Sequence, residues 1–337
     1  MSKTLYLHLG FHKTGTTSFQ HYCASNRDLL LEHGVTYPKF SAKAYREDLP
    51  SEFENHSIPL FSLLTSRPSQ YHFNITNKIE NPKLINQTYF DQLSEQLKTA
   101  TNFLVSGEDL ATLESGEIIS LCKLAGKDGY KIVPFALVRP PYALLNSAIQ
   151  EQIKNGIHWG LVGLGDMAPS LFNREDPLRN DLTRIKNLQD IFGDSMQFIP
   201  YSSACKHPDG LIGHLLSEII GISKLANKEG LLKPYKNNSR SNLWVRLQNQ
   251  VNKMHPIILE NKQNPLHYKI KYFSGNIDQK FLLSEQEFEL IQDKFNEIHN
   301  KLTSLLPSIF FREELQFSDP INSAAFIEEI SRQLADK

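Results

Sequence analysis

The sequence predicts an α/β protein in which a mainly parallel sheet is flanked by helices. Apolar runs of strand length alternate with segments of helical periodicity, as in residues 4–9 followed by 16–33. This alternation is typical of a parallel sheet covered on both faces. A loop bounded by glycines, residues 10–15, joins that strand to that helix. Helical patterns then dominate residues 242–337, which adds C-terminal helices to the α/β part.

Each further element is predicted from its hydrophobic pattern and its flanking residues. Gly34 ends the first helix, and a proline pair and a glycine bound the helical pattern of 139–156. Residues 37–84 show no clear periodicity, so we interpret 41–87 as a variable insertion. The remaining predicted strands lie at 102–110, 130–138 and 196–202, and the remaining helices at 88–99, 115–126, 178–192, 209–221, 242–254, 285–305 and 322–335.

Composition argues against a nucleic-acid-binding protein, a disulfide-linked protein and a membrane-spanning protein. The chain has 337 residues, with 36 basic and 37 acidic side chains and a net charge of -1, which argues against wholesale nucleic-acid binding. Its three cysteines are far apart in the sequence and indicate buried thiols in a reducing compartment. Without a signal-peptide pattern or a run of eighteen apolar residues, we expect a cytoplasmic protein with no membrane span. We predict one domain over residues 1–337.

The loop GFHKTGTTS has the features of a phosphate-binding loop. A glycine-rich turn between strand and helix points backbone N–H groups at one anion, and the helix N-terminus adds partial positive charge. In loops that bind ATP or GTP, a lysine follows the second glycine. Here Thr16 holds that position, and the lysine is Lys13, three residues upstream. An ordinary strand-to-helix turn is the alternative. The predicted phosphate contacts are His12, Lys13, Thr14, Gly15, Thr16, Thr17 and Ser18.

The stretch HLGFHKTGTTSFQ, followed by NRDLLLEHGVTYPK, resembles the 5′-phosphosulfate loop of sulfotransferases, especially bacterial ones. These enzymes use PAPS, 3′-phosphoadenosine-5′-phosphosulfate, and release PAP. The resemblance covers roughly residues 4–40 and 100–222. It implies a P-loop-NTPase-like sulfotransferase fold and a catalytic Lys13 that stabilises charge on the bridging oxygen of the leaving phosphate. It implies no requirement for a metal.

A second motif agrees with this resemblance. PAPS carries a 3′-phosphate, so its enzyme needs a second anion site. Arg139 follows a predicted strand and Ser147 comes eight residues later, which matches the R-(x)₇-S motif of the family; arginine can bind phosphate with two parallel hydrogen bonds. The resemblance further implies that Ser147 communicates between the two phosphate sites. Arg240, in KNNSRSN, is a further candidate contact, and an N-cap of the next helix is the alternative reading of that segment.

Transfer to a hydroxyl group calls for a general base. In the family a histidine or glutamate after the strand between the two phosphate motifs has this role, and here Glu108 follows such a strand. Asp109 beside it and His12 in the loop are the other candidates. A carboxylate that caps a helix is the alternative for Glu108, and support of the loop is the alternative for His12.

The acceptor is the least defined part of the prediction. Relatives of this type favour a carbohydrate or glycolipid, and a small alcohol, phenol or amine stays open. The insertion 41–87 lies on the expected acceptor side. Two other functions compete, namely a P-loop kinase or nucleoside triphosphatase that uses Mg-ATP, and a nucleotide-binding module without catalysis. Aromatic residues that could stack on an acceptor, or belong to the core, are Tyr45, Phe53, Phe61, Tyr71, Phe73 and Trp159.

Overall fold

The computed structural model describes residues 3–164, 181–222, 240–259, 262–264 and 279–319, with positions 324, 327, 328 and 331. The chain forms two compact units. The first comprises Met1–Arg139 and Asp181–Lys236, and the second comprises Pro140–Asn180 and Asn237–Lys337. The prediction of one domain over the whole chain stays a prediction.

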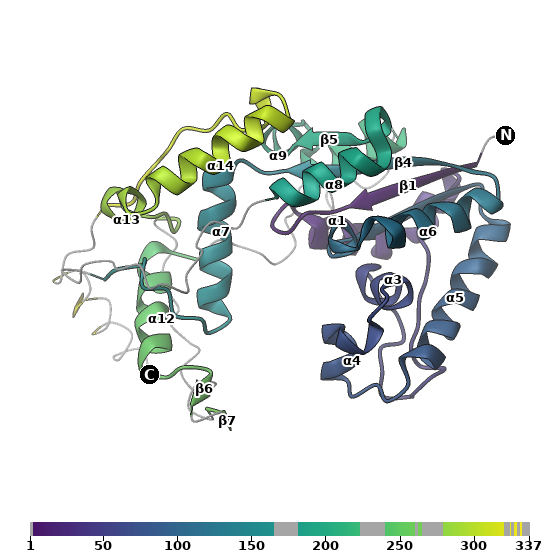
Figure 1. Cartoon of the computed structure of the whole chain (residues 1–337), viewed down its shortest axis with the longest axis horizontal. Helices are drawn as coiled ribbons and strands as arrows, with labels where there is room; N and C mark the ends of the chain where they lie inside the picture. The colour runs from purple at the N-terminus through teal and green to yellow at the C-terminus, as the bar shows by residue number, and fades with distance from the viewer. Residues whose placement is uncertain are drawn as a thin grey trace. The chain divides into compact units, whose positions relative to one another are not determined.

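A five-stranded, fully parallel sheet forms the centre of the first unit, which confirms the predicted α/β class (Figure 1). The strand order is β2-β3-β1-β4-β5. The chain therefore moves from the central β1 to one side of the sheet and returns to the other side through β4. The strands are β1 (Lys3–Leu9), β2 (Val35–Thr36), β3 (Asn102–Gly107), β4 (Tyr130–Val138) and β5 (Gln197–Pro200).

The register of the sheet determines which loops meet. Leu9 at the end of β1 lies opposite Gly107 at the end of β3, and His8 lies opposite Phe135 of β4. Because the strands are parallel, the segments that follow β1, β3 and β4 leave the same edge of the sheet. In open parallel sheets, ligands bind at this edge, where the strand order reverses. Here that position lies between β1 and β4.

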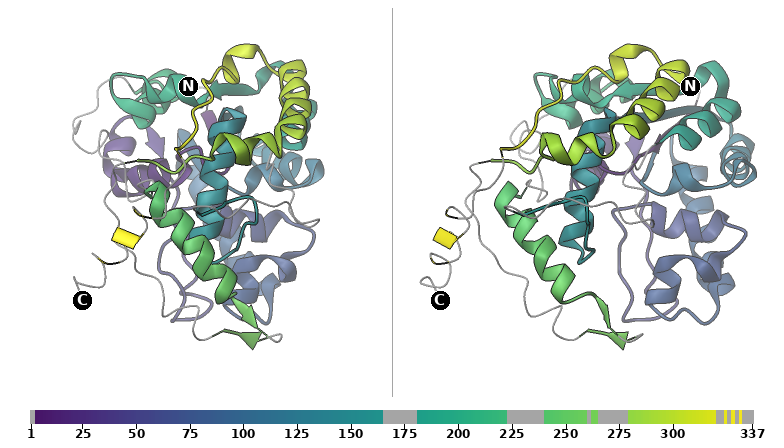
Figure 2. Two further views of the ribbon diagram at one scale, coloured as in Figure 1. Left: turned by 90° about the vertical axis from the view of Figure 1, so that its left-hand side faces the viewer. Right: turned by 60° about the vertical axis from the view of Figure 1, so that its left-hand side comes forward.

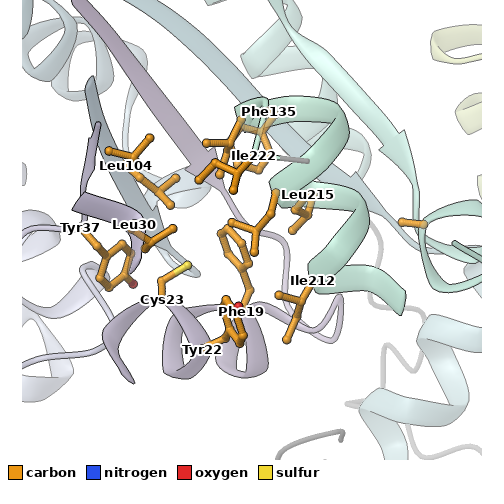
Figure 3. Packing of buried hydrophobic residues seen from close by; sticks show 14 of the residues in the cluster. Phe19, Tyr22, Cys23, Leu30, Tyr37, Leu104, Phe135, Ile212, Leu215 and Ile222 are labelled. Atoms are coloured by element: carbon orange, nitrogen blue, oxygen red, sulfur yellow. The ribbon is translucent and has the colours of Figure 1, made fainter. Parts of the chain in front are cut away.

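One face of the sheet packs against a continuous apolar cluster (Figure 3). Phe19 and Cys23 of α1 (Thr16–Ser25) meet Leu104 of β3 and Phe135 of β4, and Leu215 joins them beyond α10 (Gly210–His214). All five are fully buried. Helices α5 (Pro82–Thr99), α6 (Ser115–Lys127) and α8 (Leu182–Phe192) complete the helical layers of this unit (Figures 1 and 2).

Two predicted helices are each divided in the structure. The predicted helix 16–33 breaks at Asn26, whose side-chain amide donates to the Tyr22 carbonyl at 2.8 Å and competes with helix continuation. It becomes α1 and α2 (Arg27–Glu32), and Gly34 (φ 75°) follows as predicted. The predicted helix 285–305 breaks at Ile291 into α13 (Glu285–Glu289) and α14 (Gln292–Leu305).

The insertion 41–87 contains helices that its sequence did not predict. These are α3 (Ser57–Leu64), the short 3₁₀ turn Pro68–Gln70 and α4 (His72–Thr76). Helix α5 begins at Pro82 and not at residue 88, because Asn81 caps it by accepting a hydrogen bond from the Lys83 N–H. Helices of five to eight residues contain too few turns for a clear period.

The other predicted elements agree within a few residues. Strand β2 and helix α9 (Tyr201–Cys205), which lies between β5 and α10, were not predicted. The predicted helix 209–221 forms α10 and then a π-helical turn, Leu215–Ile220. Most of the predicted helix 322–335 lies outside the described residues. All three cysteines are free, but only Cys23 is buried. The prediction of a buried thiol is therefore wrong for Cys205, which is exposed, and only partly met by Cys122.

The second unit contains α7 (Pro141–Lys154), α12 (Asn242–Met254), α13, α14 and a small antiparallel pair, β6 (Ile258–Leu259) and β7 (Lys262–Gln263) (Figures 1 and 2). Amide side chains of α12 hold the loop after α7. The Asn249 amide group donates to the carbonyl oxygens of Trp159 and Val162, and its oxygen accepts from the Trp159 N–H at 2.8 Å.

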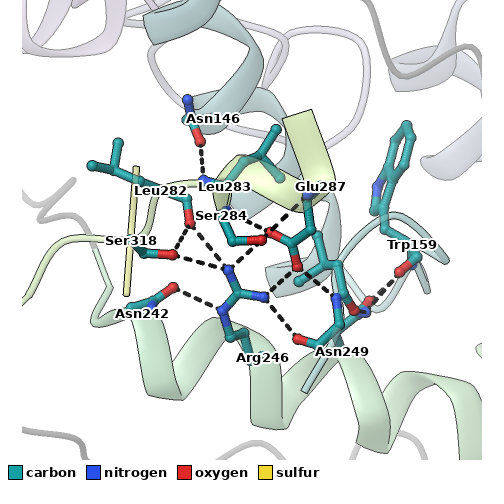
Figure 4. Close-up of polar contacts among 12 residues, drawn as sticks. Asn146, Trp159, Asn242, Arg246, Asn249, Leu282, Leu283, Ser284, Glu287 and Ser318 are labelled. Carbon is teal, nitrogen blue, oxygen red and sulfur yellow. Dashed lines mark hydrogen bonds and ion pairs between the residues drawn. The ribbon is translucent and has the colours of Figure 1, made fainter. Parts of the chain in front are cut away.

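A buried ion pair links separate segments of the second unit (Figure 4). Both terminal nitrogens of the Arg246 guanidinium in α12 donate to the Glu287 carboxylate of α13, at 2.5 and 2.9 Å. Their side chains are 6% and 2% exposed. Arg246 also donates to Asn242, Ser318 and the carbonyl oxygens of Gly163 and Leu282.

Two fully buried histidines lie in the first unit. His8 of β1 stacks on Phe135, and its Nδ1 is 2.8 Å from the Ser106 hydroxyl. His56 accepts a hydrogen bond from the Ser106 N–H on Nδ1, so its Nε2–H donates to the Pro38 carbonyl. Burial lowers the pKa of each imidazole to about 3, and the charge of Arg27 adds to the effect at His56.

We expect the stability of the protein to fall with acidification below pH 6.5. In the unfolded chain both histidines regain the ordinary pKa of about 6.5. Between about pH 6.5 and pH 3 the unfolded chain therefore binds protons at these histidines, whereas the folded protein does not. Each therefore removes about 1.4 kcal/mol per pH unit once the pH is well below 6.5. Urea midpoints measured from pH 7.5 to 5 test this. His8→Phe should reduce the slope, and replacement of the exposed His33 by Gln should leave it unchanged.

Candidate functional site

The loop after β1, residues 10–15, is a turn that leads directly into α1. Lys13 (φ 65°) and Gly15 (φ 81°) both have left-handed backbone, and α1 begins at Thr16. Lysine rarely adopts this conformation, so the fold holds Lys13 in a strained turn. A Cβ atom on Gly10 would lie 2.7 Å from the Thr16 hydroxyl oxygen, which leaves room only for glycine.

Hydroxyl groups of the loop have two different environments. Thr14 and Thr16 are buried, and both hydroxyls donate to the Phe11 carbonyl, at 2.6 and 3.3 Å. These bonds hold the turn closed across its base. Thr17 is exposed and Ser18 half-buried in the first turn of α1. The backbone N–H groups at a helix start have no intrahelical partner, so this turn provides donors for an anion.

Arg139 reaches the loop from the end of β4. Its Nη1 donates to the Lys13 carbonyl oxygen at 2.9 Å, and its guanidinium lies 5.1 Å from the ring centre of Tyr201 in α9. Arg139 Nε is buried and has no hydrogen-bond partner among the described residues. The structure therefore joins two motifs that are 126 residues apart in the sequence.

Ser147 and Arg240 belong to the second unit. Ser147 lies on α7. The Arg240 guanidinium is 5.2 Å from the Trp244 ring, and its backbone N–H donates to Gln150. Ser241 caps α12, which agrees with the alternative reading of this segment, and residues 237–239 lie outside the described chain. The roles of Ser147 and Arg240 in binding the 3′-phosphate stay predictions.

The three candidate bases form one cluster. His12 Nδ1 lies 2.8 Å from Glu108 Oε1, and His12 Nε2 lies 3.4 Å from Asp109 Oδ1. Each of the three side chains is about one quarter exposed, at 25%, 24% and 23%. They meet because β1 and β3 are neighbouring parallel strands that end opposite each other. Residues that the sequence offered as alternatives are thus in contact.

The insertion contributes two contacts that sequence reasoning did not identify. The Tyr71 hydroxyl is 3.4 Å from Asp109 Oδ2, and the Asp109 N–H donates to the Ser57 hydroxyl at 2.7 Å. Tyr71 is 5% exposed, and burial together with the Asp109 carboxylate raises the pKa of its phenol. Part of the 41–87 segment therefore lies against Asp109, which follows β3.

Most of the aromatic residues proposed for stacking are part of the core. Phe53 and Phe73 are buried and pack edge to face, with ring centres 5.4 Å apart. Trp159 is 7% exposed. Phe61 is half-buried and stacks on Tyr71, with ring centres 4.6 Å apart, so it reaches Asp109 only through Tyr71.

Within the described residues, no three His, Cys, Asp or Glu side chains form a group that could hold a metal ion. None of the helices in that part of the chain has the length and apolar character needed to cross a membrane. No protein-family model, curated protein or solved structure that was compared with the chain matches it.

Proposed function

We propose that the protein is a sulfotransferase that moves the sulfuryl group of PAPS to a hydroxyl or amine of an acceptor, with a carbohydrate or glycolipid as the favoured class. The observation that carries this proposal is the contact between Arg139 and the Lys13 carbonyl. It unites, at one edge of the sheet, the two motifs that resemble the 5′- and 3′-phosphate sites of the family.

The loop and the arginine have separate roles in this proposal. The loop N–H groups and the hydroxyls of the first turn of α1 bind the 5′-phosphate. Arg139 binds the 3′-phosphate through guanidinium nitrogens other than the one that donates to Lys13, and the unpartnered Nε is one of them. Lys13 stabilises the negative charge that develops on the bridging oxygen as the sulfur–oxygen bond breaks.

The reaction is an in-line transfer. The acceptor oxygen forms a bond to sulfur while the bond from sulfur to the bridging oxygen breaks, and PAP leaves with that electron pair. The acceptor proton passes to the cluster of His12, Glu108 and Asp109, where Glu108 is the base that the sequence favoured. The insertion, through Tyr71 and Ser57, borders the acceptor side of this cluster.

Calorimetric titration with PAP, 5′-AMP and Mg-ATP tests the donor. We expect tight binding of PAP that weakens strongly when the 3′-phosphate is missing, as in 5′-AMP. Stronger binding of Mg-ATP than of PAP would favour a P-loop kinase or nucleoside triphosphatase and reject the sulfotransferase. Binding of PAP without turnover of PAPS would favour a nucleotide-binding module.

Arg139→Ala should weaken PAP binding at least tenfold. A charge-assisted hydrogen bond contributes about 1.5–3 kcal/mol, which corresponds to about a tenfold or greater change in Kd. The affinity for 5′-AMP, which lacks the 3′-phosphate, serves as the control and should change much less. An equal loss for both ligands would mean that Arg139 acts only by supporting the loop through the Lys13 carbonyl.

A further inference from the structure

The contacts of His12 differ at its two ring nitrogens. The 2.8 Å contact of Nδ1 with Glu108 is a normal N–H···O distance, whereas the 3.4 Å between Nε2 and Asp109 is longer than a formed hydrogen bond. The shorter contact is favourable only when Nδ1 carries a proton, because a carboxylate is an acceptor only. In the neutral ring, Nε2 then bears the lone pair.

This arrangement has the form of a base held by a carboxylate. In such pairs, the carboxylate accepts the Nδ1–H and sets the tautomer, and Nε2 takes the proton from the nucleophile. The groups around His12 are consistent with these roles. Glu108 and Asp109 follow β3, Lys13 is the next residue in the chain, and the Tyr71 hydroxyl lies beyond Asp109.

We propose that His12 Nε2 is the group that removes the acceptor proton, and that Glu108 is a positioning residue that holds the His12 ring. This inference rests on the proposed function and reassigns the base within its site. Because His12 precedes Lys13 directly, the strained turn that places Lys13 also places the base. The loop then holds both the proton acceptor and the group that stabilises the leaving phosphate.

The proton balance follows from the neutral ring. As the acceptor oxygen bonds to sulfur, its proton passes to Nε2 and the ring becomes an imidazolium. The bridging oxygen of PAPS takes the electron pair of the broken bond and PAP departs. Glu108 and Asp109, one at each ring nitrogen, stabilise the positive ring. Loss of that proton to water restores the neutral base.

The tautomer of His12 can be measured without any substrate. The experiment is a long-range ¹H–¹⁵N spectrum of histidine-labelled protein at alkaline pH. It should show His12 with a protonated Nδ1 and an unprotonated Nε2. His12→Asn identifies the signal. Glu108→Ala should reduce the preference for this tautomer. His21, which contacts Glu54 at 3.1 Å, is the matched control, and its signal should respond to Glu54→Ala but not to Glu108→Ala.

The base is identified by the conversion of PAPS to PAP with water as the acceptor, measured against pH. His12→Asn should slow it by about 10²-fold or more and remove the limb in which the rate rises with pH. Glu108→Ala should slow the conversion less, and its rate should still rise with pH.

Each result has a distinct meaning. Loss of the limb in Glu108→Ala with retention in His12→Asn would overturn the proposal and make Glu108 the base. A His12 ring protonated on Nε2 in the neutral form would also overturn it. A failure to bind PAP would reject the proposed function, and the proton role with it, even if the spectrum shows the expected tautomer.

Discussion

Lys13→Ala should lower the rate of PAP formation from PAPS by about 10²–10³-fold, the usual cost of removing one preorganised donor to a developing anion. The charge on the bridging oxygen is small before the bond breaks and large in the transition state. In the proposed reaction the lysine therefore acts mainly on the rate, and we expect the affinity for PAP to fall by a smaller factor. Single-turnover kinetics with radiolabelled PAPS and calorimetry with PAP separate these two effects.

Lys78 offers a matched control for this substitution. It is the other described non-glycine residue with positive φ (50°), and it is exposed. Lys78→Ala therefore removes a lysine from the same kind of backbone conformation, away from the loop, and should leave the rate unchanged. If Lys13→Ala weakened PAP binding as much as it slowed turnover, Lys13 would contribute to ground-state binding and not to the transition state.

Arg246→Ala should destabilise the second unit by about 3–5 kcal/mol. Removal of one partner from a buried ion pair leaves the other charge without compensation, and Glu287 is 2% exposed. The substitution also removes the hydrogen bonds that Arg246 donates to Asn242, Ser318 and two carbonyl oxygens, so segments far apart in the chain lose a common partner.

Tryptophan fluorescence during urea unfolding measures the stability of the second unit. Trp159 and Trp244 are the two tryptophans of the protein, and both are buried residues of the second unit. Lys301→Ala, which breaks an exposed pair with Glu297 in α14, is the control and should change little. In a double variant, Arg246→Met with Glu287→Gln, the free energy of unfolding should fall by less than the sum of the losses in the two single variants. The reason is that neither charge is then buried without its partner.

Four of the five strands and the loop after β1 were predictable because their signals are local, whereas β2 (Val35–Thr36) was not predicted because two residues are too few to show a pattern. Residues 4–9 form an apolar run, a glycine-bounded turn follows, and helical periodicity begins at Thr16. The breaks at Asn26 and Ile291 were missed because apolar residues continue with helical spacing on both sides. The helices between residues 57 and 76 were missed because each is too short to show a period.

The candidate site also has a part that the sequence predicts and a part that depends on tertiary structure. The sequence alone determined which residue types are available: a glycine-bounded loop with Lys13, an arginine after a strand, and three groups able to take a proton. Tertiary structure decided that Arg139 contacts the loop, that His12 lies between Glu108 and Asp109, and that Tyr71 reaches Asp109. The physical reason is that these contacts depend on which parallel strands are neighbours and where they end, and strand order is set by packing between segments far apart in the chain.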